Sequence, residues 1–305
     1  MKRNDLPKKP ALIIGSTCVD VIINIPHLPV TQEDIHPTAQ TMALGGCAYN
    51  VANIVRLLGT PCTHISPVGR GMYGDYVAKC LAEVGVPVTV HVPDQENGCC
   101  YCLVEDTGER TFMSYHGVEY AFEKEWMAPY NADDFGLTYV CGIEVEEPTG
   151  INIVEYLEEH PNLQIFFAPG PRLKHIAQEK IDRILALHPI LHINELEAMT
   201  MSGKDTIEAA ADHLHSITGN SVIITLGEQG TYCKESDGTT YLIPSIPAQH
   251  VVDTIGAGDS HAGTTISCLT KGMSLRDSVA YANKVAAAIV GVKGLDIKRE
   301  ELPEL

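Results

Sequence analysis

The chain has 305 residues, of which 45% are hydrophobic and 20% are charged, and its formal net charge is −18. A chain of this length and composition can bury a large core and is typical of a globular protein. The excess of acidic residues argues against nucleic acid or an anionic membrane surface as a partner. In a chain of this charge, any phosphate that the protein binds must be held by a local site. No apolar run approaches the ~20 residues of a membrane span.

Short apolar runs alternate with helical patterns from the start of the chain. Residues 11–15 and 19–25 are predicted strands, and residues 49–59 have apolar side chains at helical spacing. Residues 63–69 and 75–85 repeat this pair of a strand and a helix. The basic residues before the first strand precede an apolar run that is too short for a signal peptide, so we expect a cytoplasmic protein.

The same alternation continues through the second half of the chain. Four further apolar runs each precede a helix-compatible segment: residues 137–142, 163–170, 190–195 and 221–227. Repeated units of a strand and a helix indicate a mostly parallel sheet with helices on both faces. The sequence therefore predicts a single α/β domain over residues 10–300.

One part of the sequence lacks helical patterns between its strands. Residues 19–44 and 86–116 hold strand-like runs with turns such as EDTGER, which is typical of hairpins added to an α/β body. We expect a small β-sheet lid built from residues 20–44 and 96–116. Because such a sheet has exposed strand edges and one apolar face, we also expect a homodimer formed through the lid.

The ten cysteines are scattered along the chain, which is typical of a protein in a reducing compartment. One cluster, CCYC at residues 99–102, could suggest a metal site. A zinc site would need a second set of Cys or His ligands at matching spacing, and the sequence has none. We therefore interpret the cluster as part of a strand with alternating exposure.

The glycine-rich stretch DTIGAGDSHAG covers residues 253–263. Residues 256–258 have little or no side chain, so successive backbone N–H groups can point into one space. A periodic apolar run follows as far as Gly272 and predicts a helix that begins near Ala257 or Gly258. Because free amides at a helix N-terminus attract anions, this stretch is suited to bind phosphate.

Asp259 lies in the first turn of that predicted helix. One interpretation is structural, because an acidic side chain there complements the helix dipole. The other is catalytic: the carboxylate accepts a proton from a hydroxyl while the neighbouring amides stabilise a transferring phosphoryl group. The local spacing leaves both open. Two other phosphate motifs are absent, since the chain has no Walker sequence and only Gly15 follows the first strand.

The segment DTIGAGD, from Asp253 to Asp259, resembles the C-terminal signature of the ribokinase, or PfkB-type, carbohydrate kinases. GGCAYNVA at residues 45–52 resembles the Gly-Gly substrate motif of the same family, and the two motifs stand in the family's order. This resemblance extends over essentially the whole chain. It implies a ribokinase-like three-layer α/β sandwich with a β-sheet lid. It also implies transfer of phosphate from ATP to an alcohol group of a small sugar or nucleoside.

The resemblance implies roles for the two motifs. Asp259 would be the general base, beside an anion hole formed by the backbone amides of Gly256, Ala257 and Gly258. The acceptor's hydroxyl groups would be held by Asp20, Gly45, Gly46 and Asn50. Purely local roles remain open for two of these residues, because Asp20 could end a strand in a turn and Asn50 could cap a helix.

The resemblance also implies a binding site for the phosphate donor. NELE at residues 194–197 would bind the nucleotide through Asn194 and support magnesium, indirectly, through Glu197. ATP would also be contacted by Thr225, Gly227 and Asn283. A monovalent cation such as potassium could be held by Asp253. The local alternative for Asn194 and Glu197 is that they only begin the helix after residues 190–193.

Two residues depart from the family pattern. His261 stands where the family usually has Phe, and we interpret it as a packing residue rather than a proton carrier. Tyr49 stands where many sugar kinases have a small residue, so it could narrow the substrate pocket or stack on a base. This difference keeps a nucleoside acceptor possible.

Glu144 follows a predicted strand and is interpreted as a support for the site.

Three functions agree with these features. The first is an ATP-dependent kinase of a sugar or nucleoside alcohol. The second is a catalytically silent regulatory protein that binds a nucleotide or sugar, against which the presence of Asp259 and the glycine-rich stretch argues. The third is a kinase of a non-sugar alcohol, although Asp20, the glycine pair and Asn50 favour a polyol.

Overall fold

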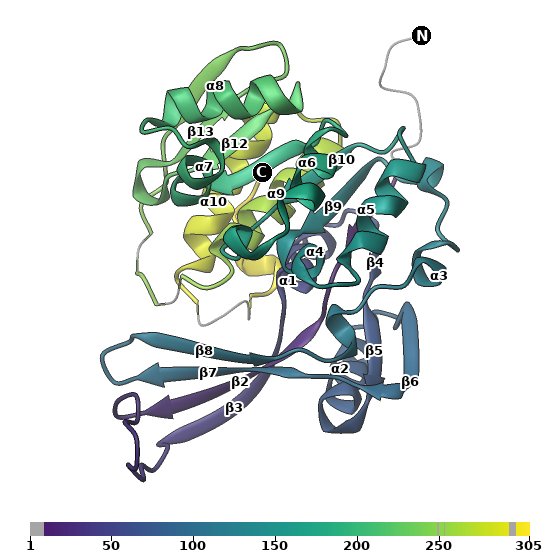
Figure 1. Ribbon diagram of the computed structural model, residues 1–305. Coiled ribbons are helices and arrows are strands. Elements are labelled where there is room, and N and C mark those ends of the chain that lie inside the picture. The colour runs from purple at the N-terminus through teal and green to yellow at the C-terminus, as the bar shows by residue number, and fades with distance from the viewer. Residues whose placement is uncertain (1–8, 249, 253, 293–296) are drawn as a thin grey trace.

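An eight-stranded sheet forms the centre of the molecule (Figure 1). The computed structural model describes residues 9–248, 250–252, 254–292 and 297–305. The strands of this sheet follow the order β14-β13-β12-β11-β10-β9-β1-β4. Their bounds are Ala11–Ile14 (β1), Cys62–Ile65 (β4), Leu137–Cys141 (β9), Ile165–Ala168 (β10), Ile190–Asn194 (β11), Val222–Thr225 (β12), Thr231–Lys234 (β13) and Thr240–Ile243 (β14).

The strands from β12 to β4 are parallel, whereas β13 and β14 are antiparallel. Parallel strands that are covered on both faces consist of nearly continuous apolar residues, and all four residues of β1 are fully buried. The predicted, mostly parallel sheet is therefore confirmed. The antiparallel pair was not predicted, because its two short strands alternate between buried and exposed residues and lack a long apolar run.

Helices cover both faces of the sheet and form the outer layers of a three-layer sandwich. One face packs against α1 (Cys47–Leu57), α9 (Ala257–Thr270) and α10 (Leu275–Ile289). The opposite face packs against α5 (Gly150–Glu159), α6 (Gln178–Leu185) and α8 (Ile207–Thr218). Three further helices lie on that second side: α3 (Lys124–Met127), α4 (Gly142–Glu146) and α7 (Glu195–Ser202). The predicted three-layer α/β sandwich is confirmed.

A smaller sheet projects from the body and forms the lid (Figure 1). Its order is β3-β2-β7-β8, with the bounds Ala39–Gly45 (β3), Cys18–Ile25 (β2), Cys99–Glu105 (β7) and Arg110–Tyr115 (β8). One face of the lid packs Val19 and Val21 against Val77 and Leu81 of α2 (Gly71–Glu83). Asp20, between these two valines, lies on the other face of the sheet.

The region between the two lid hairpins differs from the expectation. Residues 63–69 were predicted as one strand, but β4 ends at Ile65 and a separate strand, β5, covers Pro67–Arg70. β5 pairs with β6 (Val90–Glu96) in a two-stranded sheet of its own. A proline has no N–H to donate to a sheet, and Pro67 stands where the chain leaves the central sheet.

The CCYC cluster lies in β7, as the strand interpretation predicted. Its exposure does not alternate strictly, because Cys99 and Cys102 are buried and the two residues between them are half-buried. The strand lies between β2 and β8, so both of its edges are hydrogen-bonded. All ten cysteines are free thiols, and the described residues include no group of three or more acidic, His or Cys side chains that could hold a metal ion.

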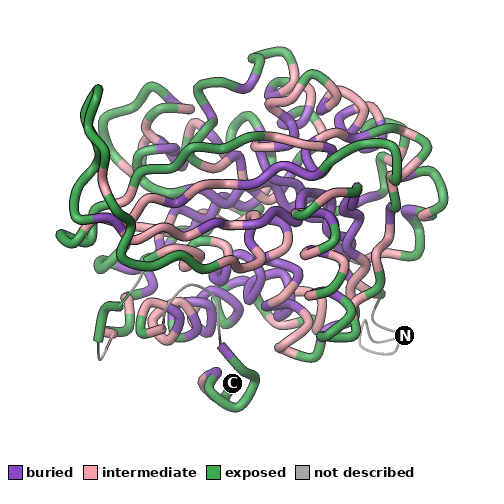
Figure 2. The backbone as a smooth tube through the Cα atoms, turned by 90° about the horizontal axis from the view of Figure 1, so that it is seen from below, coloured by how far each residue is buried: buried purple, intermediate pink, exposed green. Residues whose placement is uncertain are grey.

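Burial is distributed unevenly over the molecule. Figure 2 shows the buried backbone gathered in the body, whereas the lid strands become exposed toward their tips. None of the described helices is both long enough and apolar enough to cross a membrane. The junction between the lid and the body is therefore the place where partly buried polar groups can meet a small molecule.

Candidate active site

The predicted helix after the glycine-rich stretch is α9, which begins at Ala257. Its N-cap, Gly256, has φ 75° and ψ 0°, a left-handed conformation that glycine adopts without strain. The Ser260 amide makes the first helical bond to the Gly256 carbonyl, at 2.8 Å, and the Ala257 amide contacts the Thr254 carbonyl at 3.3 Å. A Cβ at Gly258 would meet no atom within 4 Å. The space on the side-chain side of Gly258 is therefore open, which leaves room for a bound group at the start of α9.

Asp259 is joined to the other half of the chain. The Asn50 side-chain amide donates a hydrogen bond of 2.7 Å to Asp259 Oδ2, across 209 residues of sequence. α1 and α9 approach closely, because a Cβ at Gly263 would lie only 2.9 Å from the Val51 carbonyl oxygen. The two predicted site motifs thus meet at the N-terminal ends of two packed helices.

The environment of Asp259 favours its neutral form. Burial raises its pKa from 3.8 to about 6, against the hydrogen bonds from Asn50 and Cys47, which lower it. The nearby carboxylates of Glu144 and Asp20 also raise the pKa. A carboxylate with a pKa near neutrality is a better proton acceptor than an ordinary aspartate and is still ionised above pH ~6.

The adjacent glycines Gly45 and Gly46 have different structural roles. A Cβ at Gly45 would lie 2.1 Å from Asp20 Oδ2, so glycine leaves the space that the Asp20 carboxylate occupies. Gly46 is the N-cap of α1 with φ 98°, and a Cβ there would lie 2.8 Å from the Ser16 carbonyl oxygen. Asp20 itself has a pKa raised to about 6 by burial, against a hydrogen bond from the Cys18 thiol that lowers it.

Glu144 supports this arrangement from α4. It is fully buried, and its Oε1 accepts hydrogen bonds from the Ser16 amide at 2.8 Å and the Ser16 hydroxyl at 2.6 Å. These bonds fix the connection between β1 and β2, which leads directly to Asp20. Burial raises the pKa of Glu144, while the bonds from Ser16 lower it. Glu144 Oε2 has no hydrogen-bond partner among the described residues.

Cys47 is a site residue that sequence reasoning missed. It begins α1 and lies three residues before Asn50, on the same side of the helix. Its thiol lies near enough to Asp259 to lower the pKa of that carboxyl group, and it also lies against the buried Cys141 thiol. The interaction with Cys141 and burial raise the pKa of Cys47, so it acts as a donor and not as a thiolate nucleophile. Its spacing from Asn50 was the available signal.

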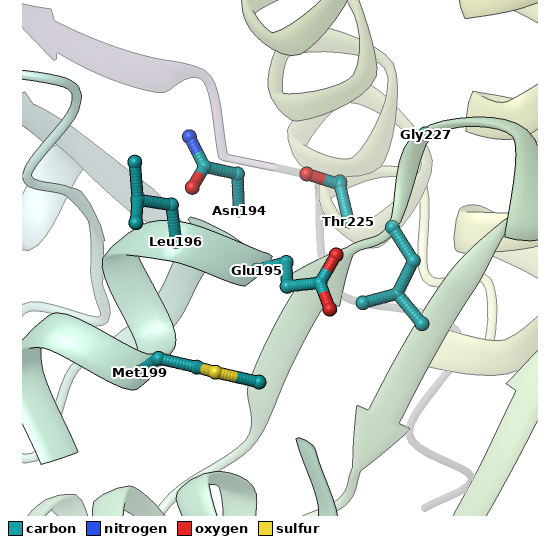
Figure 3. A pocket seen from close by; sticks show the side chains of 7 residues that line it. Asn194, Glu195, Leu196, Met199, Thr225 and Gly227 are labelled. Carbon is teal, nitrogen blue, oxygen red and sulfur yellow. The ribbon is translucent and has the colours of Figure 1, made fainter. Parts of the chain in front are cut away.

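Three of the five predicted donor residues line a separate hollow of about 630 Å³. Asn194 ends β11 and Thr225 ends the neighbouring strand β12, and Gly227 follows Thr225 (Figure 3). Sequence reasoning did not identify the apolar part of this hollow, which is lined by Leu196, Met199 and Leu226. Leu196 is 72% exposed, so its side chain is accessible to a ligand in the hollow. The hollow lies at the carboxyl edge of the parallel strands, the usual place for ligands in an α/β sheet.

Glu197 does not face this hollow as an open carboxylate. Its Oε2 accepts a hydrogen bond from the Asn194 amide nitrogen at 3.0 Å, and its Oε1 accepts one from Asn194 Nδ2 at 2.7 Å. Asn194 Oδ1 accepts a hydrogen bond from the Glu197 amide, which completes a capping box at the start of α7. The local role considered from the sequence is thus present, and any contact of Glu197 with magnesium would pass through water.

Asn283 lies in a buried polar network rather than at the hollow's wall. Its Oδ1 accepts a hydrogen bond from the Thr231 hydroxyl at 2.8 Å, and its Nδ2 donates to the carbonyls of residues 243–244. His261 contacts Asn283 and lies 2.9 Å from His192, and burial lowers the pKa of His261 to about 4. A neutral, buried imidazole agrees with the packing role expected for His261.

Tyr49 and Asp253 were also expected to lie near the active site. Tyr49 packs with the cluster that joins the lid to α2, together with Val19 and Val77. Val19 lies on the lid face opposite to Asp20, so Tyr49 is directed away from the acceptor groups. Asp253, the expected ligand of a monovalent cation, lies outside the described residues.

Two glycine-containing motifs that meet beside a small projecting sheet are also features of a known protein family. Residues 8–302 match the family model described as pfkB family carbohydrate kinase. The chain belongs to this family. It is therefore a phosphotransferase that acts on an alcohol group.

Individual members of the pfkB family show how close the similarity is. The chain is 34% identical, over 301 residues, to an uncharacterized sugar kinase, YegV, of Escherichia coli, with 97% of this chain and 93% of that protein covered. Ribokinase from Thermotoga maritima superposes with a TM-score of 0.83 at 20% identity, covering 97% and 96% of the two chains. Arabidopsis thaliana ribokinase, solved with ribose and ATP, superposes with a TM-score of 0.78 at 19% identity, covering 97% and 96%. The structural neighbours support the fold.

Proposed function

We propose that the protein transfers the γ-phosphate of ATP to a hydroxymethyl or other alcohol group of a small sugar or nucleoside. The observation that carries this proposal is the hydrogen bond between Asn50 and Asp259 beside the open backbone of Gly258. It brings a carboxylate of raised pKa, an amide from the N-terminal half and a helix N-terminus to one place. In the Arabidopsis ribokinase, ribose and ATP are the bound molecules.

The proposed reaction requires a proton acceptor, because a sugar hydroxyl does not ionise near neutral pH. The hydroxyl oxygen forms a bond to the γ-phosphorus, the bond from phosphorus to the bridging oxygen of ADP breaks, and the hydroxyl proton passes to Asp259. Backbone amides of residues 256–258, at the start of α9, would stabilise the charge on the transferring group. The Ala257 amide contacts the Thr254 carbonyl and would have to give up that contact to take part. Asn50 holds the Asp259 carboxylate in place for this step.

The acceptor side of the site has the composition expected for a polyol. Asp20 lies on the lid face opposite to Val19, next to the backbone of Gly45, and its carboxylate oxygens can accept hydrogen bonds from two adjacent hydroxyls. Asn50 and the backbone of Gly46 would complete the contacts with the acceptor. The carboxylates of Asp20, Asp259 and Glu144 lie close enough to interact, so a neutral acceptor is favoured over a sugar acid.

The donor hollow supports ATP as the second substrate. Leu196, Met199 and Leu226 offer an apolar surface for a flat base, while Asn194 and Thr225 supply polar groups. Magnesium is held in proteins mainly by phosphates and waters, with one or two carboxylates. Both carboxylate oxygens of Glu197 accept hydrogen bonds from Asn194. Glu197 would therefore support the ion indirectly, through its bound water. When bound, the ion would neutralise charge on the phosphates. Potassium at Asp253 remains part of the proposal.

The lid and the free thiols bear on water exclusion, assembly and cellular location. We propose that the lid closes over the acceptor and excludes water, which would otherwise compete for the phosphoryl group. The edges of β3 and β8 are the outer edges of the lid sheet, so pairing of two lids in a homodimer would cover them. Ten free thiols agree with a reducing cytoplasm as the proposed location.

A coupled assay of ADP release tests the proposed function. The wild-type protein is supplied with ATP and magnesium, with and without potassium, and with ribose, fructose, pseudouridine and a keto-deoxy sugar acid in turn. ADP release that depends on a neutral polyol or nucleoside is the expected result. Preference for the sugar acid would contradict the neutral acceptor. Binding of nucleotide without release of ADP for any alcohol would favour the silent regulatory protein instead.

A further inference from the structure

A second hollow, of about 340 Å³, has a lining that includes none of the residues assigned to the proposed active site. It is bounded by α1, by the edge strand β4 and by the segment that follows α2 (Figure 1). Its polar lining includes Tyr49, Asn53, Arg56 and Thr63, and its apolar lining includes Ala52 and Val86. The volume is at the lower end of small-molecule pockets, which range from about 300 to 1,000 Å³.

Arg56 is the charged residue of this hollow. Its two hydrogen bonds go to neutral oxygens, from Nη2 to Asn53 Oδ1 at 2.6 Å and from Nη1 to the Val84 carbonyl at 3.2 Å. A guanidinium has five N–H donors, so three remain. Arg70, Arg172 and Arg183 each pair with a carboxylate, whereas Arg56 has no such partner in the described part of the chain. In a protein of net charge −18, a cation left without a carboxylate at a hollow is suited to bind an anion.

Further polar groups around Arg56 lack partners. Neither the Tyr49 hydroxyl nor the Asn53 side-chain nitrogen makes a hydrogen bond to another described residue, and both residues line the hollow. β4 pairs with β1 alone among the described strands. Its Ile65 carbonyl bonds toward β1, and the His64 carbonyl on the free side accepts a hydrogen bond from the Thr89 hydroxyl. The N–H groups of alternate β4 residues therefore face the free edge beside the hollow.

We propose that this hollow is a binding site for a small oxyanion, a carboxylate or a phosphate monoester, that carries a compact apolar body. Arg56 would form two parallel hydrogen bonds to the anion, and the Tyr49 hydroxyl would donate a third. Ala52 and Val86 would contact the apolar body. The site is distinct from the phosphate donor site, because its lining shares no residue with the hollow beside Asn194.

The position of the hollow connects it to the proposed base. Tyr49 and Arg56 belong to α1, the same helix whose Asn50 holds Asp259. An anion bound to Arg56 would restrict α1, and any change in affinity for the acceptor caused by the anion must be matched by an equal effect of the acceptor on the anion. The site thus has the position of an effector site.

Binding of simple probes tests this inference without using activity. Phenyl phosphate, benzoate and the neutral benzyl alcohol are titrated by calorimetry into protein saturated with magnesium and ADP, which fills the donor site. Wild-type protein is expected to bind at least one of the two anions saturably, and benzyl alcohol about tenfold more weakly or less, because a charge-assisted hydrogen bond is lost. Whichever anion binds more tightly identifies the head group.

Matched variants assign the binding to this hollow. Arg56→Gln is expected to weaken the anion at least about tenfold, whereas Arg70→Gln, which removes the same charge from the exposed pair with Glu96, leaves it unchanged. Tyr49→Phe keeps the ring and is expected to weaken binding about threefold to tenfold. If Arg56→Gln does not fold, the Tyr49→Phe result decides. No saturable anion binding by the wild type, or wild-type affinity in both Arg56→Gln and Tyr49→Phe, would overturn the proposal.

Discussion

The acceptor side and the donor side of the proposed active site are built in different ways. The acceptor side combines Asp20, Asn50 and Asp259 from distant parts of the chain, and burial raises the pKa of both carboxylates to about 6. The donor side uses the ends of two neighbouring strands, where Asn194 and Thr225 border an open hollow. The acceptor side therefore depends on tertiary packing, and the donor side depends mainly on local motifs at strand ends.

The largest effect is expected from Asp259→Asn. An asparagine can still accept the hydrogen bond from Asn50, but it cannot take the proton of the acceptor. We expect kcat to fall by roughly a hundredfold to ten-thousandfold, with little change in the Kd of ATP. Steady-state kinetics and ATP titration measure the two effects. An equal loss of kcat and of affinity for ATP would mean that Asp259 also supports the donor side.

A smaller effect on the acceptor side is expected from Gly45→Ala. The new Cβ would lie 2.1 Å from Asp20 Oδ2 and must displace the carboxylate. We expect KM for the acceptor to rise about tenfold, through loss of a hydrogen bond to a charged group, with KM for ATP unchanged. Gly136→Ala is a suitable control, since the nearest atom to its Cβ would lie 3.4 Å away. An unchanged acceptor KM would show that Asp20 does not contact the acceptor.

The donor side is expected to respond locally to Asn194→Ala. This change removes the N-cap of α7 and both hydrogen bonds between the Asn194 side chain and Glu197. Loss of a cap costs about 1 kcal/mol, and we expect KM for ATP to rise about fivefold while KM for the acceptor stays constant. Thermal unfolding and kinetics with each substrate varied in turn check this. An effect confined to the acceptor would contradict the assignment of this hollow.

The buried carboxylates should also make stability depend on pH. A carboxyl group whose pKa is raised on folding binds more protons in the native state, so the free energy of unfolding falls as pH rises from about 4 to about 6. Asp259→Asn removes one of these groups, and the variant should be more stable than the wild type at pH 7, by on the order of 1 kcal/mol given the partial exposure of the site. Denaturant unfolding at several pH values measures this. A variant less stable than wild type at pH 7 would contradict the raised pKa.

The sequence predicted the central sheet and the starting point of α9 well. Continuous apolar runs such as that of β1 specify buried parallel strands, and Gly256 with Ala257 is a strong local signal for a helix start. The sequence also placed Asn50 and Asp259 in site motifs. Their hydrogen bond could not be read from local spacing, because it depends on how α1 packs against α9.

Other features depended on contacts that a linear pattern does not contain. The alternating strands β13 and β14 gave no apolar run long enough to be recognised. Tyr49 was considered for the acceptor pocket, but it turns toward α2 because of its angular position on α1. The contact between Cys47 and Asp259 requires the same packing of two helices. Such tertiary contacts determine the acceptor side more than the donor side.

Asp259 is proposed to accept the proton of the acceptor hydroxyl. The most direct test is a carbon-13 NMR titration of its carboxyl group, assigned with Asp259→Asn, set against the acidic limb of the pH profile of kcat/KM. We expect both to give a pKa of about 6. In Cys47→Ala, both should move upward together, because the thiol's hydrogen bond to the carboxylate is lost, while Cys47→Ser should restore them. A carboxyl group that titrates near 4, or a kinetic limb that stays in place when the carboxyl pKa moves, would contradict the role of Asp259 as the base.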